Sequence, residues 1–136
     1  MLTTATIDKV VRAALDEDAP WGDITSESLI PADAMADATL EAREPGVFSG
    51  GEVFAAAFRL CDPSITVKLL VTDGDAFEAG ATLATVHGPA RAILTAERIG
   101  LNFAQRMSGI ATLTARYKAE VAHTRVRIAD TRKTTP

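Results

Sequence analysis

The residues with the clearest chemical potential stand together in the segment DTRKTTP, residues 130–136. Arg132 and Lys133 are adjacent cations, and Thr131 and Thr134 flank them with hydroxyl groups. An arginine can bind a planar carboxylate through two parallel hydrogen bonds, and a lysine offers a compact charge to a phosphate. If a parallel strand precedes the segment, these side chains lie at its carboxyl end, where barrel enzymes place their active sites. The pattern indicates an anion-binding site, and a solvated basic tail is the simpler alternative.

A second polar group is predicted on one face of a helix that begins near Pro89. At 100° per residue, one side of this helix gathers Arg91, Arg98, Asn102 and Gln105. The predicted core side holds Ile93, Ala96, Gly100, Phe103, Ala104 and Met107. Arginines and amides without a carboxylate suit an anionic ligand or a packed interface. An ordinary solvent-exposed face is the alternative.

Other chemistries have weaker support in the sequence. His87 and His123 have no cysteine or carboxylate at metal-ligand spacing, so no metal site is predicted. Cys61 is the single cysteine, and we expect a buried thiol rather than a nucleophile. The segment SGGEVFAAA lacks the G-K-[ST] ending of a phosphate loop. Asp23 and Ser26 are expected to shape a turn or cap a helix.

Charge is distributed unevenly along the 136 residues. The last 21 carry six basic and two acidic residues, against eight basic and sixteen acidic in the first 115. The basic end has no aromatic residue except Tyr117 and no zinc pattern, which disfavours nucleic-acid binding. The N-terminus does not have the pattern of a signal peptide, and no apolar run approaches the roughly 20 residues of a membrane span. We therefore expect a cytoplasmic protein without a nucleic-acid or membrane partner.

Hydrophobic periodicity predicts an α+β order of elements. Helices are expected over residues 3–19, 51–61 and 89–124, and the last is expected to be broken or bent at Ser108 and Gly109. Residues 20–31 are expected to be mostly loop. Strands are expected over residues 36–43, 47–50, 64–71, 82–86 and 125–130. The last of these strands has no evident partner in the rest of the chain.

Several motifs occur together in an order that resembles a known family. They are ALDEDAPWGDITSESLIP, AREPGVFSGGEV, LTAERIGLNF, SGIAT and IADTRKTTP. From Leu15 to Pro136 the chain resembles quinolinate phosphoribosyltransferase, also called nicotinate-nucleotide pyrophosphorylase (carboxylating). The resemblance implies an N-terminal α/β sandwich with a hammerhead-like sheet over residues 1–110. Residues 111–136 would then begin an incomplete α/β barrel with its first helix and strand. Family members are much longer, so the chain is expected to be a fragment.

The resemblance also implies an activity and roles for particular residues. The family's glycosyltransferase (pentosyltransferase) reaction joins quinolinate to 5-phosphoribosyl 1-pyrophosphate with Mg²⁺. It yields nicotinate mononucleotide, pyrophosphate and CO₂ in NAD biosynthesis. By motif, Arg132 would bind a quinolinate carboxylate, and Lys133 would act at the reacting sugar. Arg98 would enter the active site of the partner in a homodimer. Asn102, Thr131 and Thr134 would support the site.

Both substrates are anionic, so a cationic site suits them. No residue of this chain matches the family's Mg²⁺ ligands or its remaining substrate-binding groups. The 136 residues alone are therefore expected to be inactive.

Two other readings remain open from the sequence. A related phosphoribosyltransferase-like protein that accompanies molybdate transport shares these motifs. A non-catalytic dimerisation or binding module is also compatible with the acidic body and the apolar helix faces.

Overall fold

A computed structural model describes residues 2–131 and 133. Within these residues the helices are α1 (Thr4–Asp18), α2 (Ile24–Leu29), α3 (Gly51–Cys61) and α4 (Ala90–Glu120), and the strands are β1 (Met35–Glu41), β2 (Gly46–Val47), β3 (Thr66–Leu69), β4 (Ala76–Phe77) and β5 (Thr82–Pro89). The predicted α+β class is confirmed. The short α2 corrects the prediction that residues 20–31 are mostly loop, and β4 was not predicted.

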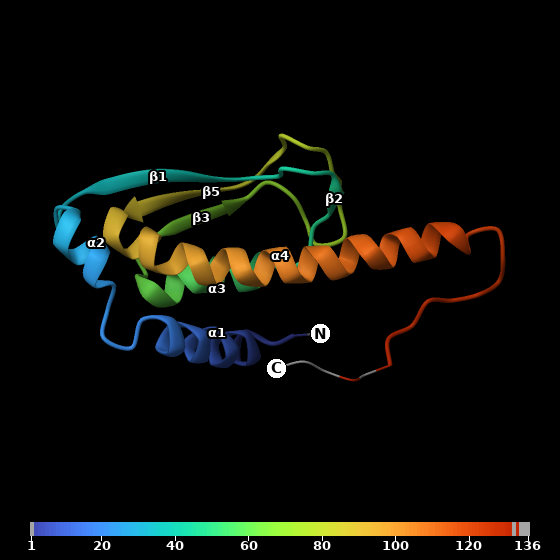
Figure 1. The fold of residues 1–136 in the computed structure, drawn as a ribbon, viewed down its shortest axis with the longest axis horizontal. Helices are drawn as coiled ribbons and strands as arrows, with labels where there is room; N and C mark the ends of the chain where they lie inside the picture. The colour runs from blue at the N-terminus through green and yellow to red at the C-terminus, as the bar shows by residue number, and fades with distance from the viewer. Residues whose placement is uncertain (1, 132, 134–136) are drawn as a thin grey trace.

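The main sheet is antiparallel, with the order β1-β5-β3 and β5 in the centre. Helices α3 and α4 lie side by side against one face of this sheet, and α1 lies beyond them (Figure 1). A second ladder joins β2 to β4 at one end of the sheet. The sheet is open in the part of the chain that the structure describes.

Strand β1 follows from its alternation of side chains. Ala36, Ala38 and Leu40 pack against the core, and the residues between them are exposed. Asp37 lies on the exposed face beside His87 of β5, and its Oδ1 is 2.8 Å from Nδ1 of that histidine. The period of two thus places one face of the strand against the helices and leaves the other to solvent.

The crossing of α3 and α4 forms the centre of the main core. Phe54 and Phe58 lie one turn apart on α3, with ring centroids 4.9 Å apart. Gly100 of α4 faces them, and a Cβ there would lie 3.1 Å from Phe54 and 3.2 Å from Phe58. The small residue therefore lets the two helices approach closely.

Helix α1 is attached to this layer by its apolar face. Ile7 and Val11 are buried against Val53, Ala56 and Ile99. At the edge of the contact, Nη2 of Arg59 donates a hydrogen bond to Oδ1 of Asp8 at 2.6 Å. The 3–4 spacing of apolar residues in α1 thus predicted Ile7 and Val11 correctly, whereas Val10, which belongs to the same apolar pattern, is exposed.

Helix α4 runs without interruption through Ser108 and Gly109, so the predicted break is wrong. A glycine inside a helix costs about 1 kcal/mol relative to alanine, and the neighbouring side chains anchor this part of the helix. The hydroxyl of Ser108 accepts from the backbone N–H of Ser49 at 3.1 Å, and Oγ1 of Thr112 accepts from Val47 N at 2.9 Å. The predicted domain boundary at residue 110 falls inside this helix and remains a prediction.

The glycine pair before α3 is held by a carboxylate. Gly50 has a φ of 97°, which favours glycine, and a Cβ there would lie 2.7 Å from Sδ of Met107. The two carboxylate oxygens of Asp73 accept from Gly50 N at 3.0 Å and Gly51 N at 2.9 Å. Asp73 therefore occupies the position where a helix N-terminus would hold a phosphate.

The predicted strand over residues 125–130 is wrong for the described chain. These residues are exposed and carry no strand assignment, and the segment after α4 turns back beneath the helices (Figure 1). A strand requires a hydrogen-bonded neighbour. No strand in the described residues pairs with this segment.

Candidate functional site

Arg98 lies on α4 with 55% of its side chain exposed. Its Nη2 is 2.9 Å from Oδ2 of Asp18, the last residue of α1. The guanidinium has five N–H donors in a fixed fork, so a single carboxylate contact leaves donors for a further acceptor. The predicted anion-binding arginine is thus accessible, and it already has one carboxylate beside it.

The corner between α1 and α2 brings a second carboxylate close to Arg98. The chain turns at Gly22, which has a φ of 84°, and Asp23 then caps α2. The carboxylate of Asp23 accepts from Ser26 N at 3.2 Å and from Ser26 Oγ at 2.7 Å. The predicted capping role of Asp23 is confirmed.

The pKa of Asp23 is lowered from its ordinary value. The hydrogen bonds from the hydroxyl and the backbone N–H of Ser26 are the main causes, and the positive charge of Arg98 adds to them. Arg98 therefore lies near two carboxylate side chains, Asp18 in contact and Asp23 further away. The corner therefore places acidic side chains around the accessible guanidinium of Arg98.

The other members of the predicted polar face have different roles. Nε of Arg91 donates to the backbone carbonyl of Ile30 at 2.7 Å, so this arginine holds the segment between α2 and β1. Asn102 and Gln105 are exposed. Of the face predicted on α4, Arg98 is the member with an accessible cationic group beside the α1–α2 corner.

No ion pair or hydrogen bond joins the described residues of the C-terminal segment to Arg98. Thr131 and Lys133 are exposed and follow the irregular segment after α4. Arg132 and Thr134 lie outside the described residues. The role assigned to this segment by resemblance therefore stays a prediction.

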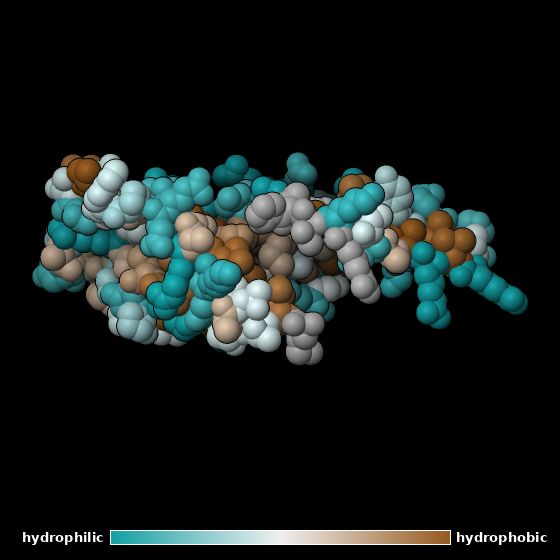
Figure 2. All heavy atoms as spheres, turned by 90° about the horizontal axis from the view of Figure 1, so that it is seen from below, coloured by the Kyte–Doolittle hydropathy of each residue, from teal (hydrophilic) through white to brown (hydrophobic). Residues whose placement is uncertain are grey.

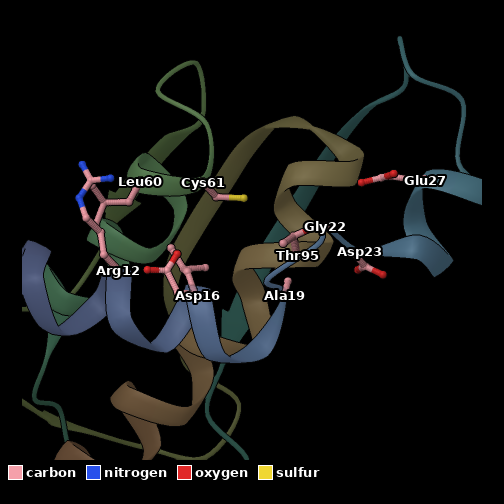
Figure 3. A pocket seen from close by; sticks show the side chains of 10 residues that line it. Arg12, Asp16, Ala19, Gly22, Asp23, Glu27, Leu60, Cys61 and Thr95 are labelled. Carbon is pink, nitrogen blue, oxygen red and sulfur yellow. The ribbon is translucent and has the colours of Figure 1, made fainter.

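A pocket of about 330 Å³ lies next to the same corner, between α1, α2, α3 and the start of α4 (Figure 3). It is lined by Arg12, Leu15, Asp16, Ala19, Gly22, Asp23, Glu27, Leu60, Cys61 and Thr95. Cys61 is half-buried rather than fully buried. Burial and then the charge of Asp62 raise the pKa of its thiol, so it is a poor nucleophile.

The sequence did not predict this pocket or the Asp18–Arg98 pair. The signal that could have found them is the acidic run at residues 16–18, because carboxylates are unfavourable at a helix C-terminus without a cationic partner.

The residues that the structure describes lack two further features. No group of three or more His, Cys, Asp or Glu side chains there could hold a metal ion. No helix there combines the length and apolar character that crossing a membrane requires.

The sequence and the fold match one family. Residues 23–108 match the family described as "Quinolinate phosphoribosyl transferase, N-terminal domain". A chloroplastic "Nicotinate-nucleotide pyrophosphorylase [carboxylating]" of Oryza sativa subsp. japonica is 42% identical over 134 residues. That match covers 98% of this chain and 36% of the relative. A "Probable nicotinate-nucleotide pyrophosphorylase [carboxylating]" of Bacillus subtilis is 39% identical over 120 residues. That match covers 88% of this chain and 41% of the relative.

A solved structure agrees with the sequence comparison. The crystal structure of NadC from Streptococcus pyogenes superposes on the whole chain with a TM-score of 0.94 at 38% identity, and 48% of that protein is covered. The chain therefore spans about two fifths of the curated relatives and about half of this solved protein.

Proposed function

The chain belongs to the quinolinate phosphoribosyltransferase family, and from that premise we propose that it is the N-terminal part of an enzyme of NAD biosynthesis. The enzyme joins quinolinate to 5-phosphoribosyl 1-pyrophosphate and releases pyrophosphate and CO₂ to give nicotinate mononucleotide. The observation that supports this most directly is the accessible Arg98 on a fold that matches, over the whole of this chain, about half of a solved family member.

The proposed reaction requires cationic groups around two anionic substrates. A bond forms between the pyridine nitrogen of quinolinate and the anomeric carbon of the sugar, while the bond from that carbon to pyrophosphate breaks. The carboxylate next to the nitrogen leaves as CO₂, and a proton replaces it on the ring. Negative charge develops on the leaving pyrophosphate, where preorganised cations lower the barrier.

In this proposal the chain supplies three of those cations. Arg98 and Arg132 bind carboxylates of quinolinate, for which the arginine fork is suited. Lys133 lies at the reacting sugar and its pyrophosphate, and Asn102, Thr131 and Thr134 support them. Mg²⁺ accompanies the sugar donor and neutralises pyrophosphate charge. Its ligands are expected in the part of the relatives that this chain does not span.

The family resemblance, together with the accessible side chain of Arg98, favours a dimeric enzyme. Arg98 lies on α4 at the α1–α2 corner, and Lys133 belongs to the segment beyond the far end of the same helix. From Arg98 to Glu120 the helix advances 22 residues, which is about 33 Å, and the segment after it turns back beneath the helices (Figure 1). We propose that Arg98 completes the active site of a second copy, rather than the one that contains its own Lys133.

The test compares two forms of the protein. One is residues 1–136, and the other is the full-length enzyme, meaning this chain followed by the C-terminal part that its relatives possess. With quinolinate and the sugar donor, the full-length form should release CO₂ and pyrophosphate, and the 136 residues alone should not. No turnover by the full-length form would contradict the proposed function, and turnover by residues 1–136 would contradict the proposed division of the site.

Arg98→Ala in the full-length enzyme should raise the KM for quinolinate by about 100-fold, because a charged hydrogen-bonding partner of a substrate carboxylate is lost. Arg106, an exposed arginine on the same helix, provides the control variant Arg106→Ala. Wild-type kinetics for Arg98→Ala would remove this residue from the site. Mixing Arg98→Ala with Lys133→Ala subunits should restore activity if the site is shared between two copies.

A further inference from the structure

We infer that Asp18 is a positioning residue, which holds the guanidinium of Arg98 in the orientation that receives a substrate carboxylate. The inference rests on the proposed function, because it assigns Asp18 a role only through Arg98. The observation is the 2.9 Å contact between Oδ2 of Asp18 and Nη2 of Arg98, which joins the end of α1 to α4.

Local helix energetics oppose the placement of Asp18. Residues Asp16, Glu17 and Asp18 form the last turn of α1, and that turn contains no basic residue. The C-terminus of a helix carries a partial negative charge, so carboxylates there are unfavourable. The unfavourable position of Asp18 at this helix end must therefore be offset by an interaction outside α1. The one ion pair of Asp18 in the described structure is with Arg98.

Asp18 is not required to attach α1 to the rest of the fold. The helix is held to α3 and α4 by the buried side chains of Ile7 and Val11 and by the Asp8–Arg59 pair. The Asp18–Arg98 pair lies at the surface, with 30% and 55% of the two side chains exposed. Ion pairs that are this exposed add little to stability because water screens them.

The two nearby carboxylates act differently on Arg98. The oxygens of Asp23 accept from Ser26, so this residue contributes negative charge without a contact to the guanidinium. Asp18 makes the direct contact, at a single nitrogen. The long arginine side chain has many rotamers, and fixing one of them before the substrate arrives lowers the entropy cost of binding. The remaining N–H donors stay available to a substrate carboxylate.

The test is a double-mutant cycle in the full-length enzyme with Asp18→Ala, Arg98→Ala and the double variant. Asp18→Ala should raise the KM for quinolinate by about 10-fold, since a small misplacement of a binding group is costly. The kcat and the KM for the sugar donor should change less than about two-fold. The double variant should be no worse than Arg98→Ala, because Asp18 acts only through that arginine.

A conservative series separates positioning from folding. Asp18→Glu keeps the charge and should recover part of the loss, and Asp18→Asn keeps an acceptor oxygen and should fall between wild type and Asp18→Ala. Asp8→Asn is the matched control, since it removes the other Asp–Arg pair of α1, at 2.6 Å, away from Arg98. It should leave the KM for quinolinate unchanged. Melting temperatures identify any variant that is misfolded, and Asp18→Asn then replaces Asp18→Ala in the cycle.

The outcomes distinguish this inference from the proposed function. If Arg98→Ala raises KM and Asp18→Ala leaves it unchanged or lowers it, the positioning role is wrong and the function stands. If the effects of Asp18→Ala and Arg98→Ala on the KM for quinolinate add in the double variant, the positioning role is also wrong. If Arg98→Ala has no effect on an active enzyme, the placement of Arg98 in the site fails first.

Discussion

Residues 90–104 of α4 lie against the sheet and α3, whereas the rest of the helix bonds to Ser49 and Val47 through Ser108 and Thr112 and then extends past the sheet (Figure 1). The first part contributes every fully buried residue of the helix. The second part exposes Ile110, Leu113 and Tyr117, at 66%, 52% and 58%, and their spacing of three and four places them on one face. Figure 2 shows hydrophobic atoms among hydrophilic side chains at this end of the molecule. One half of the helix is packed within the chain, and the other presents an apolar stripe that nothing in the described residues covers.

The largest expected effect is on the free energy of unfolding, which substitutions against the packed half of α4 should lower much more than substitutions in the exposed half. Phe58→Ala removes a ring packed against Gly100 and should lower the free energy of unfolding of residues 1–136 by about 3–5 kcal/mol. Leu113→Ala in the distal half should change it by less than about 0.5 kcal/mol. Urea titrations followed by circular dichroism measure both. Equal losses would contradict the division of α4 into a packed and an uncovered half.

A smaller effect is expected at the junction of the halves. Ser108→Ala removes the hydroxyl that accepts from Ser49 N and donates to its carbonyl at 3.2 Å. An unsatisfied, partly buried N–H should cost about 1–2 kcal/mol. Thr114→Ala is the control, because its hydroxyl bonds only to the carbonyl of Ile110 in its own helix, at an exposed position. The same urea titration compares them, and an equal effect of both would show that the bridge to Ser49 is dispensable.

The smallest effect is a pH dependence that belongs to the packed region. The pKa of Asp8 is lowered, chiefly by its hydrogen bond with Arg59, and that of Asp62 by its hydrogen bonds with Ser64. A carboxyl group with a lowered pKa in the folded state adds stability above its unfolded pKa, and this is lost as the pH falls through the folded value. Stability should therefore decrease below about pH 4.

Asp8→Asn should make that acid dependence shallower without changing its sign. Urea midpoints measured from pH 6 to pH 2 provide the check. An unchanged slope in Asp8→Asn would show that the Asp8–Arg59 pair does not contribute.

The fold was largely predictable because local periodicity records which side of an element is buried. Ile7 and Val11 marked the inner side of α1, and the alternation of Ala36, Ala38 and Leu40 marked β1. Periodicity does not record partners across the chain. The bond from Ser108 to Ser49 stabilises a helix that the sequence predicted to break, and residues 125–130 lack the neighbour that a strand needs.

The candidate site was predictable only in part, for the same reason. The face of α4 that contains Arg98 was identified from the helical wheel, but its contact is with Asp18, 80 positions earlier in the sequence. Arg132 and Lys133 were predicted as substrate-binding residues from the family motif. The kinetic experiments proposed above test the role of Lys133.

The uninterrupted course of α4 fixes the distance and the rotation between its packed half and its exposed C-terminal half. Each residue of a helix advances the axis by 1.5 Å and turns it by about 100°. Inserting a single alanine between Thr112 and Arg116 would leave the packed half in place and rotate the end of α4, up to Glu120, by about 100° relative to it. The spacing of this stretch should therefore tolerate substitutions far better than changes in length.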